Sequence, residues 1–319
     1  MRVRLANRAD AVNYSPGAFS PLGHMAPHIR ISPFNPVIME ALLKKETKGD
    51  PGVLDPGFWL DGGRAMVLTG SGRQALKLAL KRTGLDSGRS VLIVTTTGGP
   101  YISSCVTSAI EEICGWSRTP EKNTGAILLI HEFGFPCPLP QPLRDLGLPV
   151  IEDCAYGTGS RTSGGAVGAV GDYAIYSLTK YYPLPFGGLL ASRDDLAGIP
   201  GGHIIPDEDR RLLEGFLIRS GGLHEQWNET RMANWRFFEE RLGRFAAPYF
   251  HPDGGIVPGV FAAKLPPAVN GARIKQSCVS AGIESTEYYG NGGFYFPVHQ
   301  FLTDYEKSYI LHHFLQGVS

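Results

Sequence analysis

Short apolar runs alternate with amphipathic segments along the first half of the chain. The runs "AMVLTG" at 65–70 and "SVLIVTT" at 90–96 have the length of strands, and the segment between them, "SGRQALKLALKRTG", repeats its apolar residues at helical spacing. Leu76, Ala79 and Leu80 fall on one face of that helix. The pattern predicts a strand, a helix and a second strand in succession.

The same alternation continues to about residue 192. It predicts a helix over about 101–114, a strand at "GAILLIHEF", a short helix near 141–146 and a strand at "PVIED". The segment "DYAIYSLTK" then reads as a strand that enters a turn, and "FGGLLAS" as the next strand. This order is typical of an α/β fold with a mainly parallel central sheet, helices on both faces, and functional loops at the carboxyl ends of the strands.

The two ends of the chain differ from this middle part. Residues 1–60 are irregular apart from one helical stretch, "PVIMEALLKKE", and we interpret them as an N-terminal arm. Helices at about 206–219 and 228–246 precede a tail that contains a strand near "VFAAKL", a helix at "NGARIKQSCVSAG", a Gly/Tyr-rich loop and a last helix at "TDYEKSYILHHFLQ". We therefore predict a large domain over 61–227 and a small C-terminal α/β domain over 228–319.

Composition narrows the classes of partner. Thirty basic and thirty acidic residues balance, and no dense Lys/Arg stripe favours nucleic acid or an anionic membrane. The apolar runs fall far short of the roughly 20 residues that cross a bilayer, and "MRVRLANRAD" does not resemble a secretory signal. Five cysteines show neither metal-ligand spacing nor a disulfide framework, which suits a reducing cytoplasm. We expect a cytoplasmic protein without a metal, whose partners are small molecules or a second copy of itself.

Lys180 is the only charged residue in "YSLTKYYPLPFGGLLA". A lysine in apolar surroundings must lose its proton or find a partner. Alternatively, its stem packs while its ammonium group reaches solvent. The residues around it leave both interpretations open.

Other chemically suggestive motifs also lie at strand ends. In "TGSGRQAL", Ser71 and Gly72 lead into a helix whose free N–H groups can bind an anion, with Arg73 as an added charge, although a plain glycine turn has the same sequence. In "VIEDCAYG", Asp153 can hold a protonated ring nitrogen and Tyr156 can donate to a ring oxygen, although Asp153 can also cap a turn.

Two further residues complete the set of candidates. Ser177 stands three residues before Lys180, so one turn can offer a hydroxyl to an anion and an amine to a carbonyl. His131 ends the strand in "LLIHEFG", where a single histidine is more often structural than catalytic. An anion site, an acid for a pyridine nitrogen and a reactive lysine are together what pyridoxal 5′-phosphate requires.

Seven motifs from about residue 64 onward carry a family resemblance. They are "GSGRQALKLAL", "GAILLIHEFG", "PVIEDCAYGTGS", "GAVGDYAIYSLTK", "GGLLAS", "NETRMAN" and "FPVHQFLTDYE". In this order they resemble the DegT/DnrJ/EryC1/StrS family of fold-type I PLP-dependent aminotransferases, which is best known for acting on nucleotide-linked keto sugars. The resemblance implies that family's fold, with pyridoxal 5′-phosphate as the cofactor.

The resemblance also implies roles for single residues. Lys180 corresponds to the Schiff-base lysine and Asp153 to the carboxylate that pairs with the pyridinium nitrogen, while Tyr156 is similar to the phenol that bonds the ring oxygen in the aspartate aminotransferase branch. The implied cofactor contacts also include Ser71, Gly72, Arg73, Tyr101, Ser177 and Asn228. His131 and Arg231 are candidates for substrate contact.

The implied activity is the transfer of an amino group from an amino-acid donor to a keto acceptor, with a nucleotide-linked keto sugar as one candidate acceptor. Two alternatives stay open: another PLP reaction, such as elimination, decarboxylation or dehydration, and a non-catalytic subunit with the same fold. Fold-type I enzymes complete their site from two chains. We therefore expect a homodimer in which the arm, Asn228 and Arg231 reach the partner's cofactor pocket.

Overall fold

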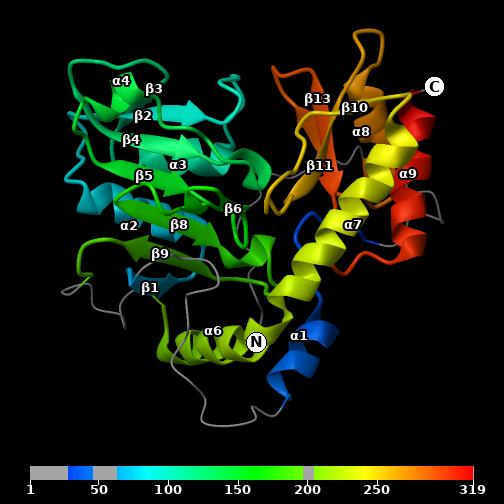
Figure 1. Cartoon of the computed structure of the whole chain (residues 1–319), viewed down its shortest axis with the longest axis horizontal. Coiled ribbons are helices and arrows are strands. Elements are labelled where there is room, and N and C mark those ends of the chain that lie inside the picture. The colour runs from blue at the N-terminus through cyan, green and yellow to red at the C-terminus, as the bar shows by residue number, and fades with distance from the viewer. Residues whose placement is uncertain (1–27, 46–62, 197–204, 319) are drawn as a thin grey trace.

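The computed structural model describes residues 28–45, 63–196 and 205–318. Its larger part is built on a seven-stranded sheet with the order β1-β9-β8-β5-β4-β2-β3 (Figure 1). The strands are β1 (Ala65–Thr69), β2 (Ser90–Thr95), β3 (Gly115–Ser117), β4 (Thr124–Ile130), β5 (Val150–Asp153), β8 (Tyr173–Ser177) and β9 (Gly188–Ser192).

The prediction of a mainly parallel sheet is confirmed. Strand β2 pairs in parallel with β3 and β4, β4 with β5, and β5 with β8, while β9 runs antiparallel to both of its neighbours. Strand β3 was not predicted, because its sequence "GWS" is short and two of its three residues are exposed, so no apolar run marks it. The strands that carry the candidate residues, β5 and β8, lie side by side within this sheet.

Helices cover both faces of the sheet, as predicted. On one face, α2 (Gly72–Arg82) buries Ala75, Leu76, Ala79 and Leu80 against the strands together with α3 (Ser104–Glu111). On the other face, α6 (Asp207–Ser220) packs Leu213, Phe216 and Leu217 against β8 and β9. The short helix α4 (Gln141–Arg144) follows β4.

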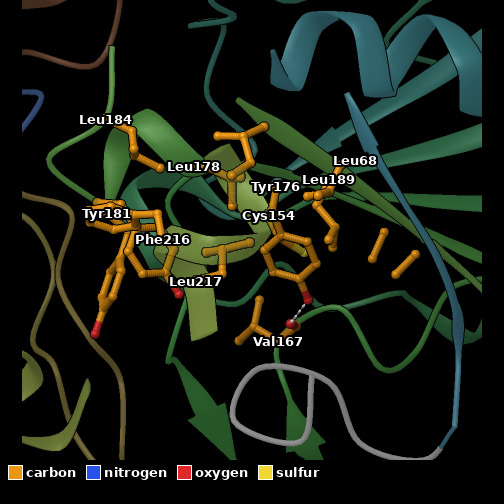
Figure 2. Packing of buried hydrophobic residues seen from close by; sticks show 14 of the residues in the cluster. Leu68, Cys154, Val167, Tyr176, Leu178, Tyr181, Leu184, Leu189, Phe216 and Leu217 are labelled. Atoms are coloured by element: carbon orange, nitrogen blue, oxygen red, sulfur yellow. Dashed lines mark hydrogen bonds between the residues drawn. The ribbon is translucent and has the colours of Figure 1, made fainter. Parts of the chain in front are cut away.

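The turn after β8 is anchored in the core by its own side chains. Figure 2 shows Tyr176 and Leu178 in an apolar cluster with Leu189 and Phe216, and the Tyr176 hydroxyl donates to the Val167 carbonyl at 2.8 Å. Successive residues of a strand point to opposite faces of the sheet. Burial of Tyr176 therefore turns its neighbour Ser177 away from this cluster.

The C-terminal part carries a second sheet. It is antiparallel, with the order β10-β11-β13-β12, and is covered by helices on one side (Figure 1). Its elements are β10 (Ala247–Pro248), β11 (Val260–Lys264), β12 (Thr286–Tyr288), β13 (Gly293–Pro297), α8 (Gly271–Ser280) and α9 (Asp304–Val318). The segment predicted as a Gly/Tyr-rich loop forms β12 and β13, because Gly290 and Gly292 adopt positive φ in the turn between them.

A long helix, α7 (His224–Leu242), links the two sheets. In Figure 1 it runs from the lower edge of the larger part to the outer side of the smaller one. It begins earlier than the predicted helix, so the predicted boundary between 227 and 228 falls inside it. The two predicted domains thus have this helix in common.

The described part of the predicted arm packs on its own chain. Helix α1 (Pro36–Leu43), whose N-cap Asn35 accepts from the N–H groups of Val37 and Ile38, lies beside α6. Ile29 forms a parallel bridge with Ile283 near the small sheet. The rest of the arm lies outside the described residues. No helix in the described ranges is long and apolar enough to span a bilayer.

Candidate active site

Lys180 and Tyr156 meet beyond the carboxyl ends of β8 and β5. Lys180 closes the short 3₁₀ helix η5 (Leu178–Lys180), and its Nζ lies 5.1 Å from the centre of the Tyr156 ring. The charge interaction with Tyr156 raises the pKa of Lys180 well above its ordinary value, against the opposing effect of burial. The amine is therefore half-buried beside an aromatic partner. Of the two interpretations of the sequence, this supports the one in which the lysine finds a partner.

Asp153 is buried at the last position of β5. Its Oδ1 accepts one hydrogen bond from the N–H of Ala155, at 2.9 Å. Burial raises the pKa of Asp153, and the hydrogen bond from Ala155 offsets this only in part. A cation placed beside such a buried carboxyl group would lower its pKa and stabilise the charged form.

The N-terminus of α2 lies directly against the end of β8. A Cβ atom added at Gly72 would come within 3.0 Å of the Ser177 Cβ, and one added at Gly188 within 2.3 Å of the Ser71 carbonyl carbon. The N–H groups in the first turn of a helix have no partner within the helix and attract anions. Glycines thus bring Ser71, Gly72 and Ser177 together at one potential anion site.

The Arg73 side chain turns away from this site. Its Nη2 donates to Glu112 Oε1 at 3.0 Å, and Lys77 contacts the other oxygen of the same carboxylate. Glu112 is the C-cap residue of α3. Arg73 therefore does not lie at the predicted phosphate contact, because its guanidinium forms an ion pair with the Glu112 carboxylate.

Tyr101 belongs to an aromatic cluster beside Lys180. Its hydroxyl lies 2.9 Å from that of Tyr295, and its ring centre lies 5.1 Å from that of Tyr288. Burial raises the pKa of Tyr101, and the charge of Lys180 acts on it in the opposite direction. Tyr101 thus stands within electrostatic range of Lys180 but packs against the small sheet.

Sequence reasoning missed other members of this cluster. Phe133 adopts φ +56° and places its ring centre 4.7 Å from that of Tyr295 and 5.9 Å from that of Tyr156. Buried Glu132 accepts from the Thr97 N–H at 2.7 Å and from the Tyr288 hydroxyl. The only signals in the sequence were Gly134 after the strand and the tyrosines of the tail.

His131 does not join the other candidates. Its Nε2 lies 2.9 Å from Glu152 Oε2, and its Nδ1 accepts from the Cys137 N–H at 2.8 Å. Both ring nitrogens therefore have protein partners, with the Nε2 proton donated to the carboxylate. The ligand atoms of His131, Glu152 and Cys154 lie within 4.8 Å of one another, but these hydrogen bonds already use the imidazole. The geometry gives His131 a structural role instead of the predicted substrate contact.

Asn228 and Arg231 contact their own chain. The Asn228 Oδ1 accepts from the Tyr181 hydroxyl at 2.7 Å, and the Arg231 Nη2 donates to the Lys180 carbonyl at 3.0 Å. Arg231 is 1% exposed within the single chain. Its guanidinium is held by groups of its own chain, and the expected contact with a partner's pocket or a substrate stays a prediction.

Sequence comparison relates part of the chain to one family. The pattern of the DegT/DnrJ/EryC1/StrS aminotransferase family matches residues 117–197. GDP-perosamine synthase of Vibrio cholerae is 32% identical over 188 residues, which cover 52% of this chain and 47% of that protein. The dTDP-3-amino-3,4,6-trideoxy-alpha-D-glucose transaminase of Micromonospora megalomicea subsp. nigra is 28% identical over 185 residues, covering 50% and 44%. The matches thus span less than half of these relatives.

Solved structures share the fold over most of the chain. A putative sugar aminotransferase from Streptococcus pneumoniae, in its apo form, superposes with a TM-score of 0.66 at 14% identity, covering 92% of this chain and 98% of that one. DesV from S. venezuelae, solved with a ketimine intermediate, gives a TM-score of 0.63 at 17% identity, covering 89% and 95%. At these identities the likeness establishes the fold, which is that of fold-type I aminotransferases.

Proposed function

We propose that this chain, whose residues 117–197 match the DegT/DnrJ/EryC1/StrS aminotransferase family, is a pyridoxal 5′-phosphate-dependent aminotransferase. One observation carries the proposal. A lysine next to a phenol, a buried carboxyl group with a raised pKa and a helix N-terminus opened by glycine all lie at the carboxyl ends of β1, β5 and β8. Each of these features suits one part of this cofactor.

The residues fit the cofactor's three parts. The first turn of α2, with Ser71, Gly72 and Ser177, would hold the phosphate, because a Cβ at Gly72 would crowd that space. Asp153 would pair with the protonated ring nitrogen, a cation that relieves the cost of its buried charge. Tyr156 would donate to the ring oxygen, and Lys180 would bind the aldehyde carbon covalently. When bound, pyridoxal 5′-phosphate supplies the electron sink that lets an amino group move between carbon skeletons.

Lys180 also has the position of a proton carrier. Its amine is adjacent to the Tyr156 ring, and both are near Tyr101, so phenols surround it while the charge of Glu284 also acts on it. A general base must lose its proton within the working pH range, whereas Tyr156 holds the proton on this lysine when no cofactor is present. We infer that the Tyr156 hydroxyl turns to the cofactor's ring oxygen on binding, which lowers the pKa of Lys180 toward that range.

The acceptor that we propose is a nucleotide-linked keto sugar. Its support is the naming of the relatives as GDP-perosamine synthase and a dTDP-aminosugar transaminase. The amino donor is an amino acid, as in aminotransferases generally.

We further propose a cytoplasmic homodimer. Its support is the resemblance to fold-type I enzymes, which complete their site from two chains. Light scattering at low micromolar concentration tests this proposal. A fully active monomer of 34.6 kDa would contradict it.

The decisive experiment follows the visible absorbance of the cofactor on the full-length chain. We expect added pyridoxal 5′-phosphate to give an absorbance band that borohydride fixes on Lys180, and Lys180→Ala to lose both the band and the fixation. Lys81→Ala, a change at an exposed lysine in the last turn of α2, is the matched control and should keep both. A borohydride-stable adduct in Lys180→Ala would overturn the assignment.

The same spectrum separates aminotransfer from its alternatives. An amino-acid donor should bleach the band, and a keto acid should restore it. A band that no donor bleaches, together with release of ammonia or carbon dioxide, would indicate another PLP reaction. A chain that gives no band at all would fit a non-catalytic subunit and would refute the proposal.

A further inference from the structure

The backbone carbonyls of the Lys180 turn are held by side chains from distant segments. A short helix such as η5 leaves its last carbonyls without partners inside the helix. Within the turn, the Leu178 carbonyl accepts from the N–H groups of Tyr181 and Tyr182. The next three carbonyls, those of Thr179, Lys180 and Tyr181, all accept from side chains elsewhere in the chain.

The donors come from three separate elements. Ser32 Oγ, in the N-terminal arm, donates to the Thr179 carbonyl at 2.7 Å. Arg231, in α7, donates through Nη2 to the carbonyls of Lys180 at 3.0 Å and Tyr181 at 3.3 Å. Gln300, which follows β13, donates to the Tyr181 carbonyl at 2.8 Å. The turn is thus fixed from outside its own domain.

Arg231 and Gln300 form one unit. Arg231 Nε donates to Gln300 Oε1 at 2.7 Å, and the guanidinium carbon lies 4.8 Å from the centre of the Tyr181 ring. Arg231 is buried, and no carboxylate is among its described hydrogen-bond partners. Burying a cation among neutral carbonyls costs free energy unless its N–H groups are well hydrogen-bonded. The chain therefore keeps at this turn a residue whose burial opposes folding.

We propose that Arg231, assisted by Gln300 and Ser32, is a positioning residue that fixes the backbone of the Lys180 turn and so aims the lysine amine at the cofactor. The inference rests on the proposed function, because it concerns how Lys180 meets pyridoxal 5′-phosphate. It assigns to Arg231 a task within its own chain, at a backbone carbonyl, and no contact with the substrate.

The alternative is that these bonds only hold the two parts of the chain together. The two readings differ in what a mild substitution changes. If the bonds only join the parts, weakening them lowers the melting temperature and leaves cofactor affinity as it was. If they aim Lys180, affinity and the fraction of cofactor bound at Lys180 fall even when the fold is intact, because a 1 Å displacement of a reacting group is enough to lose its chemistry.

The test compares four full-length variants with the wild type. Arg231→Lys keeps the charge but loses the planar fork whose Nη2 reaches two carbonyls and whose Nε reaches Gln300. Gln300→Leu removes one donor, and Ser32→Ala removes another at a half-buried site. Arg236→Lys, an exposed arginine on the same helix, is the control. We would measure the dissociation constant of pyridoxal 5′-phosphate by absorbance, the fraction of Lys180 fixed by borohydride at subsaturating cofactor, and the melting temperature.

We expect Arg231→Lys to weaken cofactor binding about tenfold or more, about 1.4 kcal/mol, and Ser32→Ala and Gln300→Leu to weaken it about threefold. Lys180 fixation should fall in the same order, with Arg236→Lys unchanged. Unaltered affinity and fixation in Ser32→Ala and Gln300→Leu would overturn the inference, including the case in which Arg231→Lys fails to fold. A wild type without any absorbance band would instead refute the proposed function itself.

Discussion

Glu152 and Asp153 are adjacent buried acids whose surroundings act on their pKa values in opposite directions. Burial alone would raise the pKa of Glu152, but hydrogen bonds from His131 and from the N–H groups of Gly171 and Val170 lower it. Asp153, the next residue, has one such bond and a raised pKa. Glu152 is a satisfied structural anion, whereas Asp153 lacks the partner that a cofactor would supply. The opposite pKa shifts of these two neighbouring acids single out Asp153 as the candidate for chemistry.

Asp153→Asn should make the cofactor-free protein more stable and the enzyme far slower. Because the folded-state pKa is raised, the charged carboxylate costs stability once the pH rises above its ordinary value of 3.8, and the cost grows until the pH passes the folded-state pKa. The neutral, isosteric amide avoids this cost. We expect the variant to melt a few degrees higher at pH 7, with the difference vanishing below about pH 4.

Under the proposed function, the same variant would lose the anion that keeps the ring nitrogen protonated, so turnover should drop by several orders of magnitude. Thermal melts without cofactor from pH 3 to 8, combined with steady-state kinetics, check both halves. A loss of turnover below about tenfold, or about 1.4 kcal/mol, would show that another group protonates the ring. A melting difference that does not depend on pH would contradict the assigned pKa shift.

At this scale, sequence reasoning succeeds where a residue's role follows from its position at a strand end. It predicted that Asp153 and Lys180 follow neighbouring strands, and the structure has them there, because the carboxyl ends of parallel strands converge; their roles stay predictions. It fails where the role depends on a distant partner. His131 pairs with Glu152 and Arg231 with Gln300, 69 residues further on, and no local spacing indicates either pair.

Among the elements, the segment after β4 contains the one non-glycine residue that has a positive φ within the described ranges. Phe133 has φ +56° and Gly134 φ +95°, and a Cβ added at Gly134 would lie 2.6 Å from the Val257 carbonyl and 2.8 Å from that of Tyr156. A left-handed conformation costs a non-glycine residue roughly 1–2 kcal/mol. Strain of this kind is retained at functional sites, and here it directs the Phe133 ring toward Tyr156.

Gly134→Ala should therefore destabilise the protein by about 3 kcal/mol, the sum of backbone strain and the close contacts. Gly147→Ala is the matched control: φ is +62° there, but no atom lies within 4 Å of the added Cβ, so about 1 kcal/mol is expected. Urea unfolding of the cofactor-free proteins measures both. Equal losses in the two variants would mean that the carbonyls of Val257 and Tyr156 move aside without cost.

Elements with a clear apolar period were the predictable ones. The central strands and α2 follow from runs and repeats that are buried on folding. Strand β3 and the β12–β13 pair could not be predicted, since an edge strand needs few apolar residues and a glycine-rich hairpin resembles a loop. Tertiary pairing, rather than local preference, makes these segments strands.

On the scale of the whole molecule, the two sheets are joined by polar contacts next to the site. Arg231 bonds the Lys180 carbonyl, Tyr288 bonds Glu132, and the hydroxyls of Tyr101 and Tyr295 lie 2.9 Å apart. The cofactor would bind on residues of the larger part, yet the turn that carries its lysine is held from the smaller one. The two parts should therefore respond to the cofactor as one cooperative unit.

Saturating pyridoxal 5′-phosphate should accordingly protect both sheets from hydrogen exchange to the same extent. A ligand at 100 times its dissociation constant stabilises the folded state by about 2.7 kcal/mol, and core amides that exchange through global unfolding should slow by about a hundredfold. We expect this in β5 and β8 and equally in β13, whose Phe294 and Phe296 are fully buried. Lys180→Ala, which cannot bind the cofactor covalently, should show much weaker protection in both sheets. Protection confined to β5 and β8 would show that the small sheet unfolds independently, and the contacts through Arg231, Tyr288 and Tyr101 would then not couple the two parts.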